Sequence, residues 1–237
     1  MMRKFKHTIA YKKTKRFLKQ LSGEDVWFKP QSQRLQVRFG DWCIDPSCIT
    51  DKSIVYSLGV GEDIDFDIGM IENFGVNIHA FDPTPNSIEW LNNKTLSDKF
   101  IFRPFGISGF DGTSKLYPRV NKQGKKSRSM FSVLQEGEVK QEAVKVTMRS
   151  LPSVMNELGH DKIDILKMDI EAAEYDVVRD IVNANINIRQ ILVEFHHRFK
   201  SIGKARTIEA VTVLNNYGYK IFFISDLGRE YSFIKID

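Results

Sequence analysis

Short apolar runs alternate with longer amphipathic stretches along the chain from Ile54 onward. Short runs rich in β-branched and aromatic residues are typical of buried strands, and apolar residues three or four positions apart are typical of surface helices. The short runs predict strands at Ile54–Leu58, Asn77–Phe81, Phe100–Phe105, Ile163–Met168, Gln190–Phe195, Tyr219–Ser225 and Glu230–Ile236. The amphipathic stretches predict helices at about Ile64–Phe74, Pro85–Asn92, Leu151–Leu158, Ala172–Asn183 and Lys204–Tyr217. This alternation favours an α/β fold in which helices cover both faces of a mainly parallel sheet.

The last two predicted strands are joined by only four residues, 226–229. A link of this length cannot make the crossover that joins parallel strands, so these two strands must form an antiparallel hairpin. The expected seven-stranded sheet is therefore mixed at one end, whereas a dinucleotide-binding Rossmann sheet is mostly parallel.

Two segments fall outside this alternation. Residues 1–50 hold a basic helix and then a mixed segment that we expect to pack over one edge of the sheet, which leaves 51–237 as the main domain. Residues 106–148 interrupt that domain as an insertion. The insertion contains two further predicted strands, Thr113–Tyr117 and Val144–Met148. The basic stretch 115–128 includes proline and glycine, so we predict a mobile loop there, which closes over a bound molecule as a lid.

The net charge of the chain is +5, but eight lysines and arginines lie within the first twenty residues, so the remainder is mildly acidic. Solvated charge is one interpretation of this basic segment. The other is peripheral contact with an anionic surface through residues 1–21, because the predicted helix has a partly apolar face. The apolar residues of that face are Phe5, Ile9, Phe17 and Leu21.

The apolar runs, the cysteines and the aromatic residues indicate where the protein is located and which partners it lacks. No apolar run reaches the ~18 residues that a membrane-spanning helix needs, and the basic segment lacks the apolar core of a secretory signal, so we expect a cytoplasmic protein. We expect Cys43 and Cys48 to be free thiols, because no second pair completes a zinc site. Aromatic residues do not alternate with the charges of 115–128 as stacking platforms would, so no nucleic-acid partner is expected. The sequence specifies no oligomeric state.

A glycine turn follows the first predicted strand, which runs directly into Gly59-Val60-Gly61 just before a predicted helix. A strand, a tight glycine turn and a helix form the nucleotide site at the carboxyl edge of such sheets. The second strand ends about twenty residues further on at Asp82, where a carboxylate can accept hydrogen bonds from ribose hydroxyls. These features predict a nucleotide cofactor.

The residues after the glycine turn indicate which cofactor. Four carboxylates follow it, those of Glu62, Asp63, Asp65 and Asp67. A dinucleotide would place its diphosphate at the helix N-terminus, where backbone N–H groups favour an anion. Carboxylates oppose a diphosphate but suit a ligand with positive sulfonium and ammonium groups, as in S-adenosylmethionine. We expect Glu62 and Asp63 to lie near the cofactor, and Asp65 and Asp67 to cap the helix.

The fourth predicted strand ends in the run LKMDIEAAE, residues 166–174. This run resembles the Lys-(Ile/Met)-Asp-(Val/Ile)-Glu-Gly-Ala-Glu signature of the FkbM-type methyltransferases, and the layout from Ser53 to about His197 is similar as well. The resemblance implies a Rossmann-like class I methyltransferase sheet, which ends in an antiparallel hairpin. It also implies O-methyl transfer from S-adenosylmethionine to a hydroxyl of a saccharide or other small metabolite.

The same resemblance implies roles for individual residues. Gly59 and Gly61 would hold the methionine part of the cofactor, and Asp82 would hold the ribose. Ile107 and its neighbours would contact the adenine, and Asp169 would face the reaction centre. The implied cofactor-binding residues are Ser57, Gly59, Gly61, Glu62, Asp63, Asp82, Pro83, Gly106, Ile107, Asp169, Ile170 and Glu171.

Three positions depart from the family pattern. Ser57 stands where many members have an acid, and Asp63 replaces a usual third glycine. Ala172 replaces the glycine of the signature, a conservative change in size that we expect to mark a tighter helix start. The serine leaves an alternative open, a Rossmann-like module that binds a cofactor or partner without catalysis.

Methyl transfer requires orientation of the acceptor hydroxyl and removal of its proton. The fifth predicted strand carries His196 to the edge where Asp169 lies, and a histidine pKa near ~6.5 suits a base, so these two are the predicted catalytic residues. Because alternate strand residues face opposite sides, we expect at most one of Glu194 and His197 to share their environment. Oxygen ligands of this kind, with Glu171, suit Mg²⁺, but we do not expect a metal.

Overall fold

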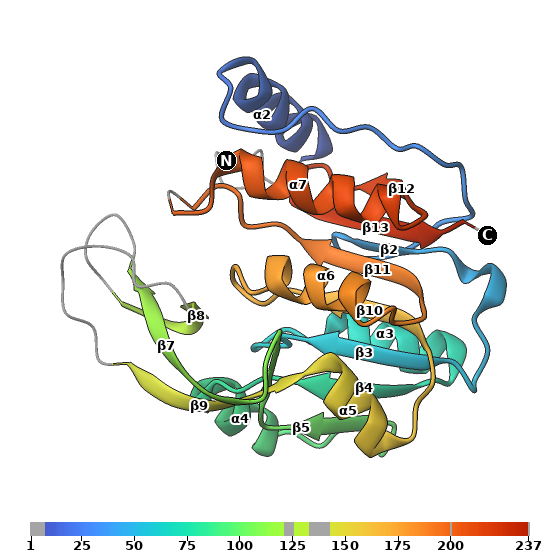
Figure 1. Cartoon of the computed structure of the whole chain (residues 1–237), viewed down its shortest axis with the longest axis vertical. Coiled ribbons are helices and arrows are strands. Elements are labelled where there is room, and N and C mark those ends of the chain that lie inside the picture. Colours follow the sequence, from blue (N-terminus) through green and yellow to red (C-terminus); the bar gives the residue numbers. More distant parts are fainter. Residues whose placement is uncertain (1–7, 121–125, 133–142, 200, 237) are drawn as a thin grey trace.

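The structure, a computed structural model, describes residues 8–120, 126–132, 143–199 and 201–236. A seven-stranded sheet runs through it in the order β12-β13-β11-β10-β3-β4-β5 (Figure 1). All neighbouring strands are parallel except β13, which runs antiparallel to both β11 and β12. The mixed sheet with a terminal antiparallel pair is confirmed. Its strands are β3 (Ile54–Leu58), β4 (Asn77–Phe81), β5 (Phe100–Arg103), β10 (Ile163–Met168), β11 (Ile188–Glu194), β12 (Tyr219–Ile224) and β13 (Glu230–Lys235).

Helices cover both faces of this sheet, as the alternation predicts. On one face, α5, α6 and α7 bury apolar residues such as Val154, Val178 and Leu214 in the larger core. On the other face, α3 and α4 contribute Met70 and Leu91 to a second core. The helices are α3 (Asp65–Phe74), α4 (Pro85–Asn92), α5 (Leu151–Leu158), α6 (Glu174–Asn183) and α7 (Gly203–Asn216).

The start of α6 differs from the sequence prediction. The helix begins at Glu174 rather than Ala172, because two residues between β10 and the helix lie in the left-handed region, with φ of 49° at Glu171 and 87° at Ala172. Left-handed backbone cannot continue into a right-handed helix, and it is costly for an L-residue. The family glycine therefore corresponds to a backbone requirement, and the interpretation of Ala172 as a conservative helix start is wrong.

The insertion forms a second sheet beside the first, in the order β6-β9-β7-β8. Its strands are β6 (Gly106–Ser108), β7 (Gly112–Val120), β8 (Lys126–Ser132) and β9 (Val144–Ser150). Residues 115–120 and 126–128 are therefore strand, and the predicted loop is wrong for them, whereas 121–125 lie outside the described residues. The proline that indicated a loop, Pro118, lies beside a register shift between β7 and β8. Strands tolerate proline at such irregular positions.

The N-terminal segment lies against the antiparallel end of the main sheet (Figure 1). It consists of α2 (Ile9–Leu21), β1 (Val37–Phe39), β2 (Trp42–Ile44) and a 3₁₀ turn at Pro46–Cys48. Ser232 of β13 donates a hydrogen bond to the Cys43 carbonyl, 2.7 Å away. Both cysteines are free thiols, as expected, with Cys43 buried and Cys48 exposed. In the described part of the chain no helix combines the length and apolarity needed to cross a bilayer.

A buried ionic network ties this segment to the end of β11. The wholly buried carboxylate of Asp25 accepts hydrogen bonds from His197, at 2.9 Å, and from Arg198. His197 thus points away from the cavity edge where Asp169 lies. Burial alone would raise the pKa of Asp25, but the hydrogen bonds from His197 and Arg198 lower it to about 2.

We expect the substitution Asp25→Asn to lower the free energy of unfolding by about 3 kcal/mol, because it leaves the Arg198 charge without its buried partner. The folded-state pKa lies below the unfolded value near ~4, so the charged carboxylate stabilises the fold above that pH. The contribution is lost as the pH falls toward about 2. Urea unfolding of both proteins at neutral pH and at several acidic values measures it. The difference in free energy of unfolding between the two proteins should vanish on acidification. Equal free energies of unfolding at pH ~7 would contradict a stabilising role for the Asp25 carboxylate.

Candidate functional site

A cavity of about 540 Å³ opens at the carboxyl edge of the main sheet. Its volume lies within the range of small-molecule and cofactor sites. Predicted residues from the first two strand ends line it: Gly59, Gly61, Glu62, Asp63, Asp82 and Pro83. Predicted residues from the insertion and the fourth strand end line it too: Gly106, Ile107, Asp169, Ile170 and Glu171. Ser57 is wholly buried in β3 beneath the glycine turn and does not line the cavity.

The glycine turn and the end of β10 touch directly. Gly59 has a φ of 73°, and a Cβ atom there would lie 1.8 Å from the Asp169 carbonyl oxygen. The amide of Asp169 donates to the Leu58 carbonyl at 3.0 Å, and the amide of Gly59 donates to the Phe81 carbonyl at 2.8 Å. Only glycine permits this approach, so the turn and the signature segment form one continuous wall of the cavity.

Asp82 holds the other half of the turn. One carboxylate oxygen accepts a hydrogen bond from the Gly61 amide at 2.8 Å. The other oxygen accepts from the amide and hydroxyl of Thr84, at 2.8 and 2.7 Å. A carboxylate has about four acceptor positions, so Asp82 both orients the turn and keeps capacity for a ligand hydroxyl at the cavity wall.

The acidic residues after the glycine turn do not all have the predicted roles. Glu62 and Asp63 are exposed at the cavity, and Asp63 also accepts a hydrogen bond from the first amide of α3, that of Asp65, at 3.0 Å. The predicted capping role of Asp67 is wrong, because its side chain is fully buried and neither carboxylate oxygen has a hydrogen-bond partner among the described residues. Burial raises the pKa of Asp67, and Lys167 opposes the rise.

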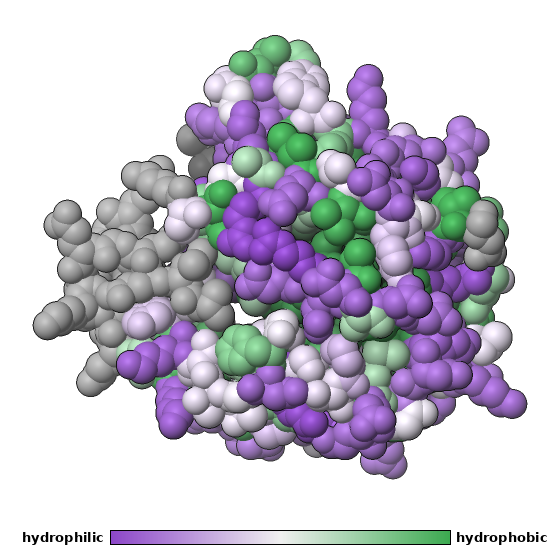
Figure 2. Space-filling model, in the orientation of Figure 1, coloured by the Kyte–Doolittle hydropathy of each residue, from purple (hydrophilic) through white to green (hydrophobic). Residues whose placement is uncertain are grey.

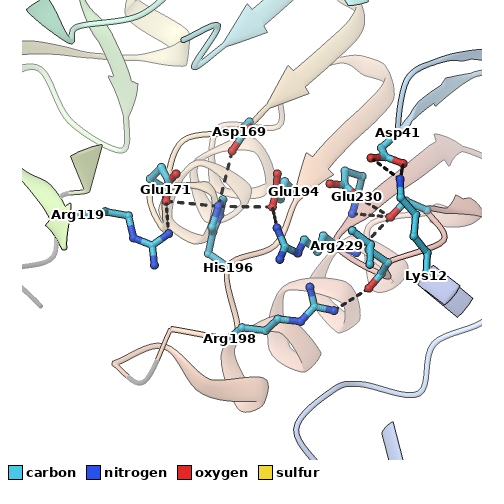
Figure 3. A network of polar contacts seen from close by, with 12 residues as sticks. Lys12, Asp41, Arg119, Asp169, Glu171, Glu194, His196, Arg198, Arg229 and Glu230 are labelled. Carbon is cyan, nitrogen blue, oxygen red and sulfur yellow. Dashed lines mark hydrogen bonds and ion pairs between the residues drawn. The ribbon is translucent and has the colours of Figure 1, made fainter. Parts of the chain in front are cut away.

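His196 lies at the centre of a cluster of carboxylates, three of which line the cavity (Figure 3). Its Nδ1 atom lies 3.1 Å from the wholly buried carboxylate of Glu174. Its Nε2 atom lies 3.6 Å from Glu171, 3.7 Å from Asp169 and 3.9 Å from Glu194. Asp169, Glu171, Glu194 and His196 therefore converge in the structure, and Glu194 rather than His197 shares the environment.

The cluster perturbs the acid–base properties of its members. Burial alone would lower the pKa of His196, but the hydrogen bond and charge of Glu174, with the charges of Asp169 and Glu171, raise it to about 10. Burial, together with the charge of Asp169, raises the pKa of Glu194 to about 8. Burial also raises the pKa of Asp169, against the opposing charge of His196. Strongly perturbed groups gathered at a cavity are typical of functional sites.

Two cations from outside the main β10–β11 edge complete the cluster. Arg119 of β7 lies 3.4 Å from Glu171, and its guanidinium stacks 3.8 Å from the centre of the Phe199 ring. Arg229, in the hairpin between β12 and β13, lies 3.6 Å from Glu194. The insertion and the terminal hairpin therefore each neutralise one carboxylate of the site.

Two parts of this site are not predicted by the sequence. The first is Glu174, the partner of His196, although it belongs to the signature run; its two oxygens accept from the amides of His196, at 3.0 Å, and Ala172, at 2.8 Å. The second is the β1–β2 hairpin, which lines the cavity through Phe39 and Trp42. Its only signal in the sequence is an aromatic pair around Gly40-Asp41, which sequence alone does not associate with the sheet edge.

Comparisons with known proteins identify the family. The model of the family described as the methyltransferase FkbM domain matches residues 53–221. A probable methyltransferase-like protein 24 from Homo sapiens is 30% identical over 145 residues, 60% of this chain and 32% of that protein. Its counterpart from Rattus norvegicus is 30% identical over 171 residues, 71% of this chain and 39% of that protein. The chain thus spans about a third of the length of these relatives.

Among solved structures, the methyltransferase FkbM from Methylobacillus flagellatus KT aligns over 78% of this chain and 44% of its own, with 11% identity and a TM-score of 0.48. The fibrillarin pre-rRNA processing protein of Methanococcus jannaschii aligns over 89% of this chain and 86% of its own, with 12% identity and a TM-score of 0.41. The family match covers well over half of the chain. The chain belongs to the FkbM family of S-adenosylmethionine-dependent methyltransferases.

Proposed function

We propose that this protein transfers a methyl group from S-adenosylmethionine to a hydroxyl of a saccharide or another small hydroxylated metabolite. The observation that carries the proposal is the contact between Gly59 and Asp169, which joins the glycine turn and the signature segment into one cavity wall. A cofactor held along the turn places its reactive end beside the carboxylate cluster, where an acceptor hydroxyl can bind.

The cofactor is assigned to the part of the cavity formed by β3, β4 and the start of the insertion. Gly59 and Gly61 would hold its methionine part, and the exposed acids Glu62 and Asp63 would face its positive groups. Asp82 retains acceptor capacity for the ribose hydroxyls. The buried apolar surface of Ile107 then suits an adenine ring.

Asp169 and His196 are the proposed catalytic residues. The predicted role of His196 as a base with an ordinary histidine pKa does not fit the structure, because its carboxylate neighbours raise its pKa to about 10. Asp169 faces the cavity from the end of β10, and His196 contacts it from behind, while the buried Glu174 fixes the orientation of the imidazole. Methyl transfer is a displacement at a carbon that the sulfonium already activates, so the protein must orient the hydroxyl and accept its proton. The acceptor oxygen is proposed to bind against Asp169, and its proton passes to the carboxylates around His196.

The test is calorimetric titration of the purified protein with S-adenosylmethionine, followed by a screen for transfer of tritiated methyl groups to glycans and small hydroxylated metabolites. We expect cofactor binding and transfer to at least one hydroxylated class. Absence of S-adenosylmethionine binding, with binding of a nicotinamide dinucleotide instead, would overturn the proposal. Binding without transfer to any acceptor would favour a non-catalytic module.

The hairpin of β7 and β8 is proposed to cover the acceptor part of the cavity, because Arg119 and Ser132 both contact Glu171. We expect Arg119→Met to raise the acceptor KM roughly three- to tenfold, the range for loss of a partly exposed ion pair and a cation–π contact. The affinity for S-adenosylmethionine should stay nearly constant. Steady-state kinetics and calorimetry measure the two quantities. Lys115→Met, an exposed change on the same strand, is the control, and equal losses of both affinities would indicate a structural role.

A further inference from the structure

A divalent cation fits the carboxylate cluster at the catalytic edge. One ligand atom each from Asp169, Glu171 and His196 lie within 4.8 Å of one another. The distances from His196 Nε2 to the carboxylate oxygens, 3.6 to 3.9 Å, are too long for hydrogen bonds. Side chains around a common ion are separated in this way, because each approaches the ion rather than its neighbour.

The orientation of His196 is the second, independent observation. Its side chain is only 7% exposed, yet within the described residues Nε2 has no hydrogen-bond partner and is directed at the three carboxylates. Its other nitrogen is held by the wholly buried Glu174, 3.1 Å away. A buried carboxylate that fixes the ring through one nitrogen and leaves the other for an ion is the usual arrangement behind a metal-binding histidine.

We propose that Asp169, Glu171 and the Nε2 atom of His196 bind one divalent cation. The mixed imidazole and carboxylate set favours a first-row ion such as Mn²⁺ over Mg²⁺, which binds mainly through oxygen. This inference rests on the proposed function: the ion would bind the acceptor through its oxygen atoms and make the hydroxyl more acidic. The proton then passes to Glu194, which lies outside the ligand set and lines the cavity.

The test is calorimetric titration of the chelator-treated protein with MnCl₂ in the absence of S-adenosylmethionine. We expect one site per chain. Asp169→Asn and Glu171→Gln, which preserve side-chain size, should each weaken binding more than roughly tenfold, and Glu174→Gln should weaken it about 10- to 100-fold through the orientation of His196. Asp98→Asn, an exposed change before β5 at the opposite edge of the sheet, should leave binding unchanged.

The outcomes separate this inference from the proposed function. Absence of Mn²⁺ binding, or binding that Asp169→Asn does not affect, would show that the imidazole alone neutralises the cluster and would overturn the site. Full methyl transfer by the chelated protein would also overturn the site, but it would leave the proposed function intact. Mn²⁺ binding by a protein that binds no S-adenosylmethionine would support the site and remove the proposed function.

A separate observation concerns α2, whose polar side faces the protein and whose apolar side faces outward. Arg16 donates to the carbonyls of Phe28 and Ser225, at 3.3 and 3.4 Å, and Gln20 donates to the Val26 carbonyl at 2.8 Å. The apolar side chains are more than half exposed: Ile9 58%, Phe17 51%, Leu18 59%, Leu21 61% and the neighbouring Trp27 58%. Figure 2 shows apolar side chains gathered at the top of the molecule, where α2 lies.

The chemistry of this face points to one kind of partner. Phe17 and Trp27 form an edge-to-face pair with ring centres 6.1 Å apart, so the two aromatic residues pack together on this face. The exposed Lys13 and Lys15 flank it, and α2 contains no acidic residue. An exposed apolar face with aromatic residues and flanking lysines is typical of helices that lie in the interface of an anionic bilayer. We infer that α2 docks the protein on an anionic lipid surface.

Co-sedimentation of the full chain with phosphatidylcholine vesicles, with and without phosphatidylserine, tests this. We expect binding only to the anionic vesicles, weakened by salt, and at least roughly tenfold weaker for the double variant Phe17→Ser, Leu21→Ser. The control is Leu35→Ser, which removes an exposed leucine outside the patch. Equal binding to both vesicles, no effect of the double variant, or a concentration-dependent dimer that this variant abolishes would overturn the inference.

Discussion

Asp169→Asn is expected to slow methyl transfer by about 10²- to 10⁴-fold, the usual range for loss of a positioned acid–base group. The substitution keeps the size of the side chain but removes the charge that faces the cavity and His196. Affinity for S-adenosylmethionine should fall far less, by under about tenfold, because most of the proposed cofactor contacts come from β3 and β4. Single-turnover transfer of tritiated methyl groups and calorimetry measure the two effects separately.

The control for Asp169 is again Asp98→Asn, which removes a carboxylate from the opposite edge of the sheet and should leave the rate unchanged. A transfer rate in Asp169→Asn within about threefold of the unchanged protein would remove Asp169 from the mechanism. Parallel losses of rate and cofactor affinity would instead assign it to cofactor binding alone.

Gly59→Ala is expected to have the largest effect on stability in the chain, lowering the free energy of unfolding by more than about 4 kcal/mol. The added Cβ atom would lie 1.8 Å from the Asp169 carbonyl oxygen, so β3 and β10 must separate where they meet. The matched variant is Gly61→Ala. Gly61 also has a positive φ, 56°, but nothing lies within 4 Å of its Cβ position, so only the backbone cost of about 1–2 kcal/mol applies.

Urea unfolding of the two alanine variants measures this contrast, and calorimetry with S-adenosylmethionine reports on the turn itself. Both variants place an alanine in left-handed backbone, so their difference isolates the contact with Asp169. Similar unfolding free energies for the two proteins would show that the glycine turn and the signature segment can move apart at little cost in free energy. The contact would then not account for the shape of the cavity.

Three neighbouring strands of the main sheet could be predicted from the sequence residue by residue. β3, β4 and β10 have the predicted bounds, because strands inside a parallel sheet are buried on both faces and read as continuous apolar runs. Deviations occur where a run meets a turn. β5 ends at Arg103 rather than Phe105, because the amide of Phe105 bonds to the Arg103 carbonyl, 2.9 Å away, and turns the chain toward β6.

The site could be predicted where its residues follow strand ends, and only there. The edge position of Asp169 and His196 follows from the parallel order of β10 and β11. The pairing of Glu174 with His196 depends on how α6 packs behind β11, and the burial of Asp67 depends on the rotation of α3. The spacing of residues along the chain predicts neither the pairing nor the burial, because the rotation of a helix about its axis is set by its packing against the sheet.

The position of the insertion has a consequence for acceptor choice. From β3 the chain adds β4 and then β5 toward one end of the sheet, and it then returns to place β10 on the other side of β3. The second sheet is formed by the segment between β5 and β10. Ligands bind at such a topological switch point, and here its two sides are built by different stretches of chain. Strand ends form the side assigned to the cofactor, while Leu116, Phe131 and Met148 of the insertion line the other. Exchange of 109–147 between relatives should therefore alter the acceptor and preserve the methyl donor.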